Sequence, residues 1–333
     1  MSFSNILERL MNIHSLFPSS AESPERGTQS VARNRVPLKE IAVVSGKGGV
    51  GKSSVTASLA VLLSKAGARV TAIDSDVDAP NLSIILGTDI SYLTEVQASE
   101  KASIDRAKCD RCGICVSACK ADALLGVEGE PPRLIPFLCE GCGACAVVCP
   151  RSAITIKRVT SGRIGYGQTA YGFPIVSGQL DMGESSSGHI VTAVKAKGRI
   201  VAQDSASDVV LVDGPPGIGC PVIASVAGAD YALVVTEPTP AARNSLDRML
   251  TVLAHFKIPA SVVVNRFDLD SEYTRKIEDH VQAKWSIWVA QEIPSDENVP
   301  LSLSKRIPVV EFQPDCDASK ALRVLSDHVM SAI

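Results

Sequence analysis

The chain has 333 residues, of which 45% are apolar and 4% aromatic, with a formal net charge of -3 and a pI near 6.0. This length allows about two domains with a sizeable core, and the slight acidity provides no basic field for sequence-independent binding of nucleic acid. No apolar run reaches the roughly 18 residues that a transmembrane helix needs, and the first residues lack a secretory signal, so we expect a cytoplasmic protein.

The first 36 residues differ in character from the remainder of the sequence. Apolar positions between Phe3 and Phe17 fall near one stripe of a helix, and the Pro- and Ser-containing stretch after them is typical of a flexible linker. We expect residues 1–36 to form an amphipathic segment that packs on the rest of the chain or on a partner. Membrane contact is the less favoured alternative, because the segment has no Lys/Arg face.

From Leu38 onward, short apolar runs alternate with segments of helical pattern. Residues 40–45 and 69–74 predict two strands, separated by a helix over about 53–65. Four later runs predict further strands, with room for helices between 240 and 283: 208–213, 231–236, 260–265 and 286–290. Near-continuous apolar strands separated by helices predict an α/β fold with a mostly parallel, doubly wound sheet that is covered on both faces.

The segment GKGGVGKS at 46–53 follows the first predicted strand and opens the first predicted helix. This is the context that a phosphate-binding loop requires. Backbone N–H groups there can surround phosphates at the helix N-terminus, while the Lys52 ammonium reaches the β and γ oxygens and the Ser53 hydroxyl ligates Mg²⁺. We therefore predict ATP and Mg²⁺ as ligands. The predicted nucleotide-binding residues of the loop are Gly46, Gly48, Gly49, Val50, Gly51, Lys52, Ser53 and Ser54.

A second lysine, Lys47, lies in the same loop between two glycines. This form of the loop resembles that of the deviant Walker A ATPases, the group that includes MinD, ParA, the Mrp-type iron-sulfur carriers and the nitrogenase iron protein. The resemblance implies a P-loop NTPase fold and a homodimer that forms in an ATP-dependent way. It also implies that Lys47 reaches the partner subunit's phosphates and supplies charge to the transition state, as an arginine finger does.

Three aspartates at predicted strand ends match the same group. The resemblance implies that Asp76 orients the attacking water, that Asp74 lies near the magnesium ion, and that Asp213 holds a magnesium-bound water. With Lys47, Lys52 and Asp76 as catalytic residues, it implies slow hydrolysis of ATP, stimulated by the dimer or by a partner. Exposed loop carboxylates are the alternative interpretation of Asp74 and Asp76.

The resemblance also implies a site for the adenine base late in the chain. Asn265 ends a predicted strand, where this group contacts adenine with an amide side chain, and Pro294 and Asp296 follow in the segment EIPSDENV. A turn residue is the alternative interpretation of Asn265.

Eight cysteines form an internal repeat in an insertion from about residue 100 to 158. Both runs have the spacing C-x2-C-x2-C-x3-C and are offset by 30 positions: Cys109, Cys112, Cys115 and Cys119, then Cys139, Cys142, Cys145 and Cys149. Thiolates at this spacing hold three irons of a 4Fe-4S cluster, and the fourth cysteine reaches the other cluster. The repeat has too little apolar material for a core of its own, so its stability must come from what the cysteines bind.

The spacing therefore predicts two 4Fe-4S clusters that exchange their fourth ligands. The first predicted set is Cys109, Cys112, Cys115 and Cys149, and the second is Cys139, Cys142, Cys145 and Cys119. Zinc is the alternative, because four-cysteine zinc sites also use C-x2-C pairs. The insertion resembles a bacterial two-cluster ferredoxin, which implies a small α+β domain.

Three smaller features of the sequence concern Lys120, the two remaining cysteines and a glycine-rich segment. The first run ends in Lys120 where the second has Pro150, and a cation beside the second cluster favours its reduced form, so we expect two different potentials. We expect the remaining cysteines, Cys220 and Cys316, to be small buried apolar side chains. The segment GRIGYG at 162–167 is not expected to bind a dinucleotide, because no predicted strand leads into it.

These features predict an N-terminal segment, an ATPase domain in two parts and an inserted domain: 1–36, then 37–99 and 159–333, with 100–158 inserted. The arrangement resembles the MinD-superfamily ATPases with an inserted ferredoxin domain. It implies a nucleotide-dependent dimer that gates the clusters, for electron transfer to a redox partner or for maturation of a metalloenzyme. A MinD/ParA-like positioning ATPase with redox-sensing clusters is the alternative, and an iron-sulfur cluster carrier is a further one.

Overall fold

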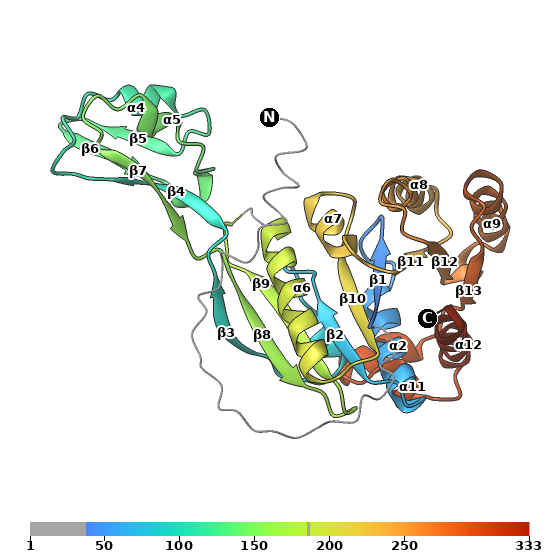
Figure 1. The fold of residues 1–333 in the computed structure, drawn as a ribbon. Coiled ribbons are helices and arrows are strands. Elements are labelled where there is room, and N and C mark those ends of the chain that lie inside the picture. Colours follow the sequence, from blue (N-terminus) through green and yellow to red (C-terminus); the bar gives the residue numbers. More distant parts are fainter. Residues whose placement is uncertain (1–37, 185–186, 333) are drawn as a thin grey trace, which may run out of the picture. The chain divides into compact units, whose positions relative to one another are not determined.

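The computed structural model describes residues 38–184 and 187–332, so the predictions for residues 1–36 lie outside it (Figure 1). Within those ranges, no helix combines the length and the apolar character needed to cross a membrane.

Nine strands form one sheet in the order β13-β12-β11-β1-β10-β2-β9-β8-β3. Their bounds are β1 Lys39–Ser45, β2 Val70–Asp74, β3 Ser91–Val96, β8 Gly162–Gln168, β9 Pro174–Leu180, β10 Val209–Pro216, β11 Tyr231–Thr236, β12 Ala260–Asn265 and β13 Val289–Ile293. Neighbouring strands from β13 to β9 run parallel, whereas β8 pairs antiparallel with both β9 and β3. The predicted mostly parallel α/β sheet is confirmed.

Helices cover both faces of this sheet (Figure 1). Their bounds are α2 Lys52–Lys65, α3 Leu82–Ile85, α6 Ser187–Asp204, α7 Cys220–Val226, α8 Pro240–His255, α9 Ser271–Trp285, α10 Asn298–Ser304, α11 Val309–Phe312 and α12 Asp317–Ala332. Alternate residues of β1 serve the two faces: Ile41 and Val43 pack in the core with α2 and α12, while Ala42 and Val44 pack in the core with α7, α8 and α9. Burial on both faces explains why the central strands are almost continuously apolar.

The structure differs from the predicted strands in two places. The last strand begins at Val289 rather than at 286, because Ser286 closes α9 in the left-handed conformation, with a φ of 54°. The antiparallel edge of the sheet, β9, β8 and β3, was not predicted. The glycine-rich segment at 162–167 is strand β8, where a Cβ on Gly165 would lie 2.2 Å from the Ile90 side chain.

Residues 99–159 follow β3 and precede β8 in the sequence, and their strands form two small sheets of their own. Strand β4 (Ser99–Ile104) pairs with β7 (Ile154–Val159), and β5 (Leu124–Val127) pairs with β6 (Glu130–Leu134), both antiparallel. Short helices follow the first cysteines of each run: α4 Ile114–Ala118 and α5 Ala144–Val147, with the 3-10 turn η2 Pro136–Leu138 between them. The main buried cluster of this segment is small, and two of its five residues are cysteines: Ala102, Cys115, Leu124, Cys145 and Ile154.

Candidate functional site

The phosphate loop joins β1 to α2, and its glycines are needed for specific contacts. Gly49 and Gly51 have φ values of 80° and 91°, in the left-handed region that other residues rarely adopt. Gly46 faces α8 so closely that a Cβ would lie 2.3 Å from the carbonyl oxygen of Ser245. The loop thus closes against α8 and leads directly into α2, and backbone N–H groups at a helix N-terminus can bind phosphates.

Lys52, the first residue of α2, is buried and bound to an acidic residue from β10. Its ammonium lies 2.8 Å from Asp213 Oδ1 and donates to the Ser53 hydroxyl at 3.3 Å. Thr56, one turn further along α2, donates to the same Asp213 oxygen at 3.0 Å. The other oxygen, Asp213 Oδ2, is buried and accepts no hydrogen bond from the described residues. This orphan acceptor fits a ligand-bound water.

Two further aspartates adjoin this pair from the end of β2. Asp74 is fully buried and accepts hydrogen bonds from the Leu82 and Asp76 amides at 2.9 and 3.2 Å. Burial, and then the charge of Asp213, raises the pKa of Asp74 to about 8. Burial also raises the pKa of Asp76 to about 6, against the opposing charge of Lys52. The structure thus brings Lys52, Asp74, Asp76 and Asp213 together, and the aspartates are not exposed loop carboxylates.

Lys47 extends from the same loop but is held by a different acid. Its ammonium lies 2.8 Å from Glu237 Oε1, just after β11, and its side chain is 43% exposed. The second oxygen of Glu237 lies 3.0 Å from the guanidinium of Arg266, which also donates to the Gly49 carbonyl at 2.6 Å. Lys47 and the loop backbone are therefore tied to one buried carboxylate within the same chain.

The three residues predicted near adenine have different surroundings. The Asn265 amide donates to the carbonyl of Val50 at 2.8 Å, so this side chain lies against the phosphate loop. Asp296 caps two helices instead: its Oδ1 accepts from the Asn298 amide at 2.9 Å, and its Oδ2 accepts from the Ala318 amide at 3.2 Å. Burial acts to raise the pKa of Asp296, but these hydrogen bonds outweigh it and hold the pKa at about 2. Pro294 directly follows β13.

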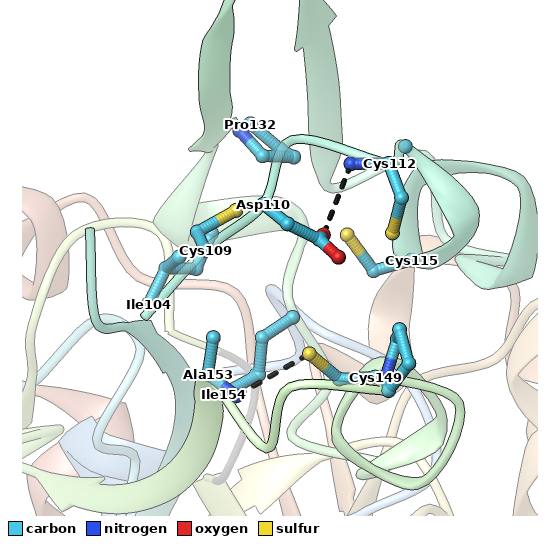
Figure 2. A pocket seen from close by; sticks show the side chains of 11 residues that line it. Ile104, Cys109, Asp110, Cys112, Cys115, Pro132, Cys149, Ala153 and Ile154 are labelled. Atoms are coloured by element: carbon cyan, nitrogen blue, oxygen red, sulfur yellow. Dashed lines mark hydrogen bonds between the residues drawn. The ribbon is translucent and has the colours of Figure 1, made fainter. Parts of the chain in front are cut away.

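The cysteines lie around two separate cavities. The first cavity is shown in Figure 2, and its cysteines are Cys109, Cys112, Cys115 and Cys149. The second is lined by Cys119, Cys139, Cys142 and Cys145. These are the two sets that the spacing predicts. Among the described residues, no three His, Cys, Asp or Glu side chains come close enough together to hold a single metal ion.

Backbone amides point at several of these sulfurs. The Ala153 amide donates to Cys149 Sγ at 3.3 Å (Figure 2), and the Ala123 amide donates to Cys119 Sγ at the same distance. A third bond runs from the Ala102 amide to Cys139 Sγ at 3.4 Å. Hydrogen bonds from N–H groups stabilise negative charge on sulfur, so these thiols are suited to act as thiolate ligands.

The prediction for Cys220 is wrong: its side chain is exposed. It is the first residue of the seven-residue helix α7 and follows Gly219, so it lies at the end of the helix rather than on its packed face. Cys316 packs against the core that contains α2 and α12, but it is half-buried rather than buried as predicted.

Sequence reasoning missed four site residues: Glu237, Arg266, Thr56 and Lys101. Glu237 and Arg266 follow the strands β11 and β12, and the sheet order places β11 next to β1 and β12 next to β11. Because the carboxyl ends of parallel strands meet at one edge, polar residues after each predicted strand could have been collected as candidates. Lys101, in β4 beside the second cysteine cavity, has no local motif that would have revealed it.

Comparisons with known proteins agree with this geometry. The sequence matches the family described as "CobQ/CobB/MinD/ParA nucleotide binding domain" over residues 41–309. It is similar to an uncharacterized protein of Methanocaldococcus jannaschii, with 36% identity over 270 residues that cover 81% of this chain and 89% of the relative. It is also similar to the septum site-determining protein MinD of Thermotoga maritima, with 26% identity over 278 residues, 81% of this chain and 80% of that protein.

The fold is also found in a solved structure. The septum site-determining protein MinD of Pyrococcus horikoshii, complexed with Mg-ADP, superposes with a TM-score of 0.53 at 19% identity, covering 88% of this chain and 96% of that chain. At this identity the likeness shows a shared fold.

Proposed function

The chain belongs to the CobQ/CobB/MinD/ParA family of nucleotide-binding domains, and on that premise we propose that it is a Mg²⁺-dependent ATPase whose nucleotide state controls a two-cluster iron-sulfur segment. The observation that carries the proposal is the coexistence of two assemblies in one chain. Lys52, Asp74, Asp76 and Asp213 converge at one edge of the sheet, while two cysteine quartets surround two cavities in residues 99–159.

The nucleotide site contains residues for each part of phosphoryl transfer to water. With nucleotide bound, Lys52 would contact the phosphates instead of Asp213 Oδ1, and Asp213 Oδ2, which has no partner among the described residues, would hold a water of the metal ion. Asp74 and Ser53 would adjoin that position, and Asp76 would orient the attacking water. Mg²⁺, when bound, offsets phosphate charge. The MinD of Pyrococcus horikoshii, solved with Mg-ADP on a shared fold, supports this assignment.

Lys47 completes the site in trans. For it to reach the phosphates of a second copy, its bond to Glu237 must break. Hydrolysis then depends on protein concentration, because the free chain keeps this lysine bound to its own carboxylate. We therefore include an ATP-dependent homodimer in the proposal.

The cysteine quartets fit 4Fe-4S clusters in two respects. Each set of four lines one cavity, and backbone amides donate to three of the sulfurs. Zinc is the alternative ligand, because four-cysteine zinc sites also use C-x2-C pairs. Such clusters, when bound, each accept or release one electron. On this proposal residues 37–99 and 159–333 form the ATPase domain and 100–158 a ferredoxin-like insertion.

The favoured role is ATP-gated electron delivery to a partner, such as a redox enzyme or a metalloenzyme under maturation. A MinD/ParA-like positioning ATPase is the second candidate, favoured by the likeness to MinD. Transfer of a cluster to another protein is the least supported role, since each quartet supplies four thiolates to its ligand and holds it firmly.

One experiment separates these roles. The Asp76→Ala variant is held in its ATP state and used to capture partners under anaerobic conditions. The capture is done once with the proposed clusters reduced and once with them oxidised. Electron delivery predicts capture of a redox enzyme that depends on oxidation state, and positioning predicts capture of a membrane or scaffold fraction in both states. The wild-type chain is expected to bind about eight irons. The Lys47→Ala variant is expected to lose ATP hydrolysis. A chain without iron, or full hydrolysis in Lys47→Ala, contradicts the proposal.

A further inference from the structure

The 30-residue repeat makes the two cysteine sites a natural internal comparison. Equivalent residues occupy equivalent places: the Ala123 and Ala153 amides, 30 positions apart, donate to Cys119 and Cys149 at 3.3 Å. Gly113 and Gly143, also 30 apart, precede α4 and α5 with φ values of 74° and 79°. Burial raises the pKa of both Cys115 and Cys145. Any difference between the sites must therefore come from positions where the repeat is broken.

The repeat is broken beside the first cysteine of each run. Ala102 lines the second cavity, and its equivalent 30 positions later, Pro132, lines the first cavity (Figure 2). The Ala102 amide donates to Cys139 Sγ at 3.4 Å. Proline has no N–H group, so Pro132 cannot donate the corresponding bond to Cys109. The second site thus has an N–H···Sγ hydrogen bond, from Ala102 to Cys139, whose equivalent from Pro132 to Cys109 cannot form at the first site.

Strand β4, which contains Ala102, also places a buried cation near the second site. Lys101 in β4 is 7% exposed, and its ammonium donates to the carbonyl of Cys139 at 3.1 Å. Its equivalent 30 positions later is Pro131, which has no charge. Glu184, whose Oε2 lies 3.3 Å from the Lys101 ammonium, offsets part of this charge. Other charged residues near the two sites, Glu140, Lys120 and the Asp110–Arg151 pair, are exposed, so their charges are screened by water.

We propose that Lys101 and the Ala102 amide make the site of Cys119, Cys139, Cys142 and Cys145 the one that is reduced first. Reduction adds negative charge, and a hydrogen bond to sulfur or a buried cation stabilises that added charge. Electrons that enter the segment rest at the second site, and the first site is the lower-potential one. The inference rests on the proposed iron-sulfur function and assigns an electron order to it.

Redox titration followed by electron paramagnetic resonance tests the proposal. Repulsion between two nearby centres splits the titration even when they are alike, so changes on substitution carry the test. Lys101→Met and Ala102→Pro are expected to lower the higher potential, whereas Pro132→Ala, which restores an N–H group, is expected to raise the lower potential. Glu184→Gln removes the offsetting charge and is expected to raise the higher potential.

The opposite signs for Lys101→Met and Glu184→Gln separate an electrostatic role from a structural one, because loss of packing would not reverse direction. Lys157→Met is the matched control: Lys157 pairs with Lys101 across β4 and β7 but is exposed, so both potentials should stay unchanged. Full iron content with shifts absent, reversed or confined to the lower potential overturns this inference alone. A wild-type chain without iron overturns the proposed function, and the inference with it.

Discussion

Both lysines of the phosphate loop are bound to carboxylates of their own chain, Lys52 to Asp213 and Lys47 to Glu237. The two pairs differ in burial: the Lys52 side chain is 7% exposed and that of Lys47 is 43% exposed. A buried ammonium without a partner is costly, and the contact with Asp213 offsets that cost for Lys52. The Lys47 pair is accessible to solvent, weaker, and suited to exchange with a second subunit.

Glu237→Gln should therefore favour the dimer. The substitution keeps the shape of the side chain but removes the charge that holds Lys47, so the lysine is freer to act in trans. We expect the protein concentration that gives half-maximal ATPase activity per subunit to fall roughly 2- to 5-fold, since a partly exposed ion pair contributes about 0.5–1 kcal/mol. Steady-state hydrolysis over a concentration series measures this.

The control is Glu272→Gln, which removes an equally charged side chain from an exposed pair with Lys276 on α9. It should leave the concentration dependence unchanged. An unchanged or higher half-maximal concentration in Glu237→Gln would show that Glu237 does not restrain Lys47.

Asp74 should make the stability of the nucleotide-free chain depend on pH. Its pKa of about 8 lies well above the ordinary value of 3.8. Between these values the folded chain holds a proton that the unfolded chain has released, so the free energy of unfolding falls as pH rises, by at most about 1.4 kcal/mol per pH unit for one group. Asp74→Asn cannot titrate and should flatten this dependence.

Urea unfolding without nucleotide or Mg²⁺ measures this pH dependence of the free energy of unfolding. The range from about pH 6.5 to 7.5 is best, because Asp76, with its pKa of about 6, has mostly lost its proton there. Asp78→Asn, on the same loop but exposed, should keep the wild-type slope. If Asp74→Asn keeps that slope as well, Asp74 is ionised in the folded chain.

At the scale of elements, contact between the phosphate loop and α8 explains why residue 46 must be a glycine. A Cβ on Gly46 would lie 2.3 Å from the Ser245 carbonyl oxygen, a backbone atom that cannot rotate away. We expect Gly46→Ala to destabilise the fold by about 1–3 kcal/mol and to weaken ADP binding at least 10-fold, because the loop must move to relieve the overlap. Urea unfolding and titration calorimetry measure the two effects.

Gly48→Ala is the matched control, because a Cβ there would lie 3.8 Å from the Pro216 side chain, an ordinary contact. It should change the free energy of unfolding by less than about 1 kcal/mol. Equal losses in the two variants would show that α8 does not hold the loop.

The sequence predicts those elements whose signals are local. Strands β1, β2, β10, β11 and β12 are continuous apolar runs with both faces buried, and each was predicted. Strand β3 was missed because most of its residues are exposed at the sheet edge, and β8 because three of its seven residues are glycines. Lys52, Ser53 and Asp213 were predictable from the loop motif and a strand end. The contacts of Glu237 and Lys101 were not predictable, because strand order and the folded repeat determine them, although the place of Glu237 after a strand made it a possible candidate.

At the scale of the whole molecule, the cysteine-containing segment emerges from a hairpin. Strands β3 and β8 pair antiparallel up to Val96 and Gly162, and the Ser161 amide donates to the Val96 carbonyl at 2.9 Å. Beyond that point, β4 and β7 pair from Ser99 and Val159 onward. Since the chain leaves and returns at neighbouring positions, the segment can be replaced by a turn without stretching the sheet.

We therefore expect a chain in which Asn-Gly replaces Ser99–Val159 to fold and bind ADP within about 3-fold of the wild-type affinity, because the small core of the segment is separate from the cores of the sheet. It should retain no iron, whereas the full chain should hold about eight per chain. Circular dichroism, titration calorimetry and iron analysis measure these properties. Aggregation or loss of ADP binding would mean that residues 99–159 are part of the ATPase domain, and retained iron would place the metal outside the cysteine repeat.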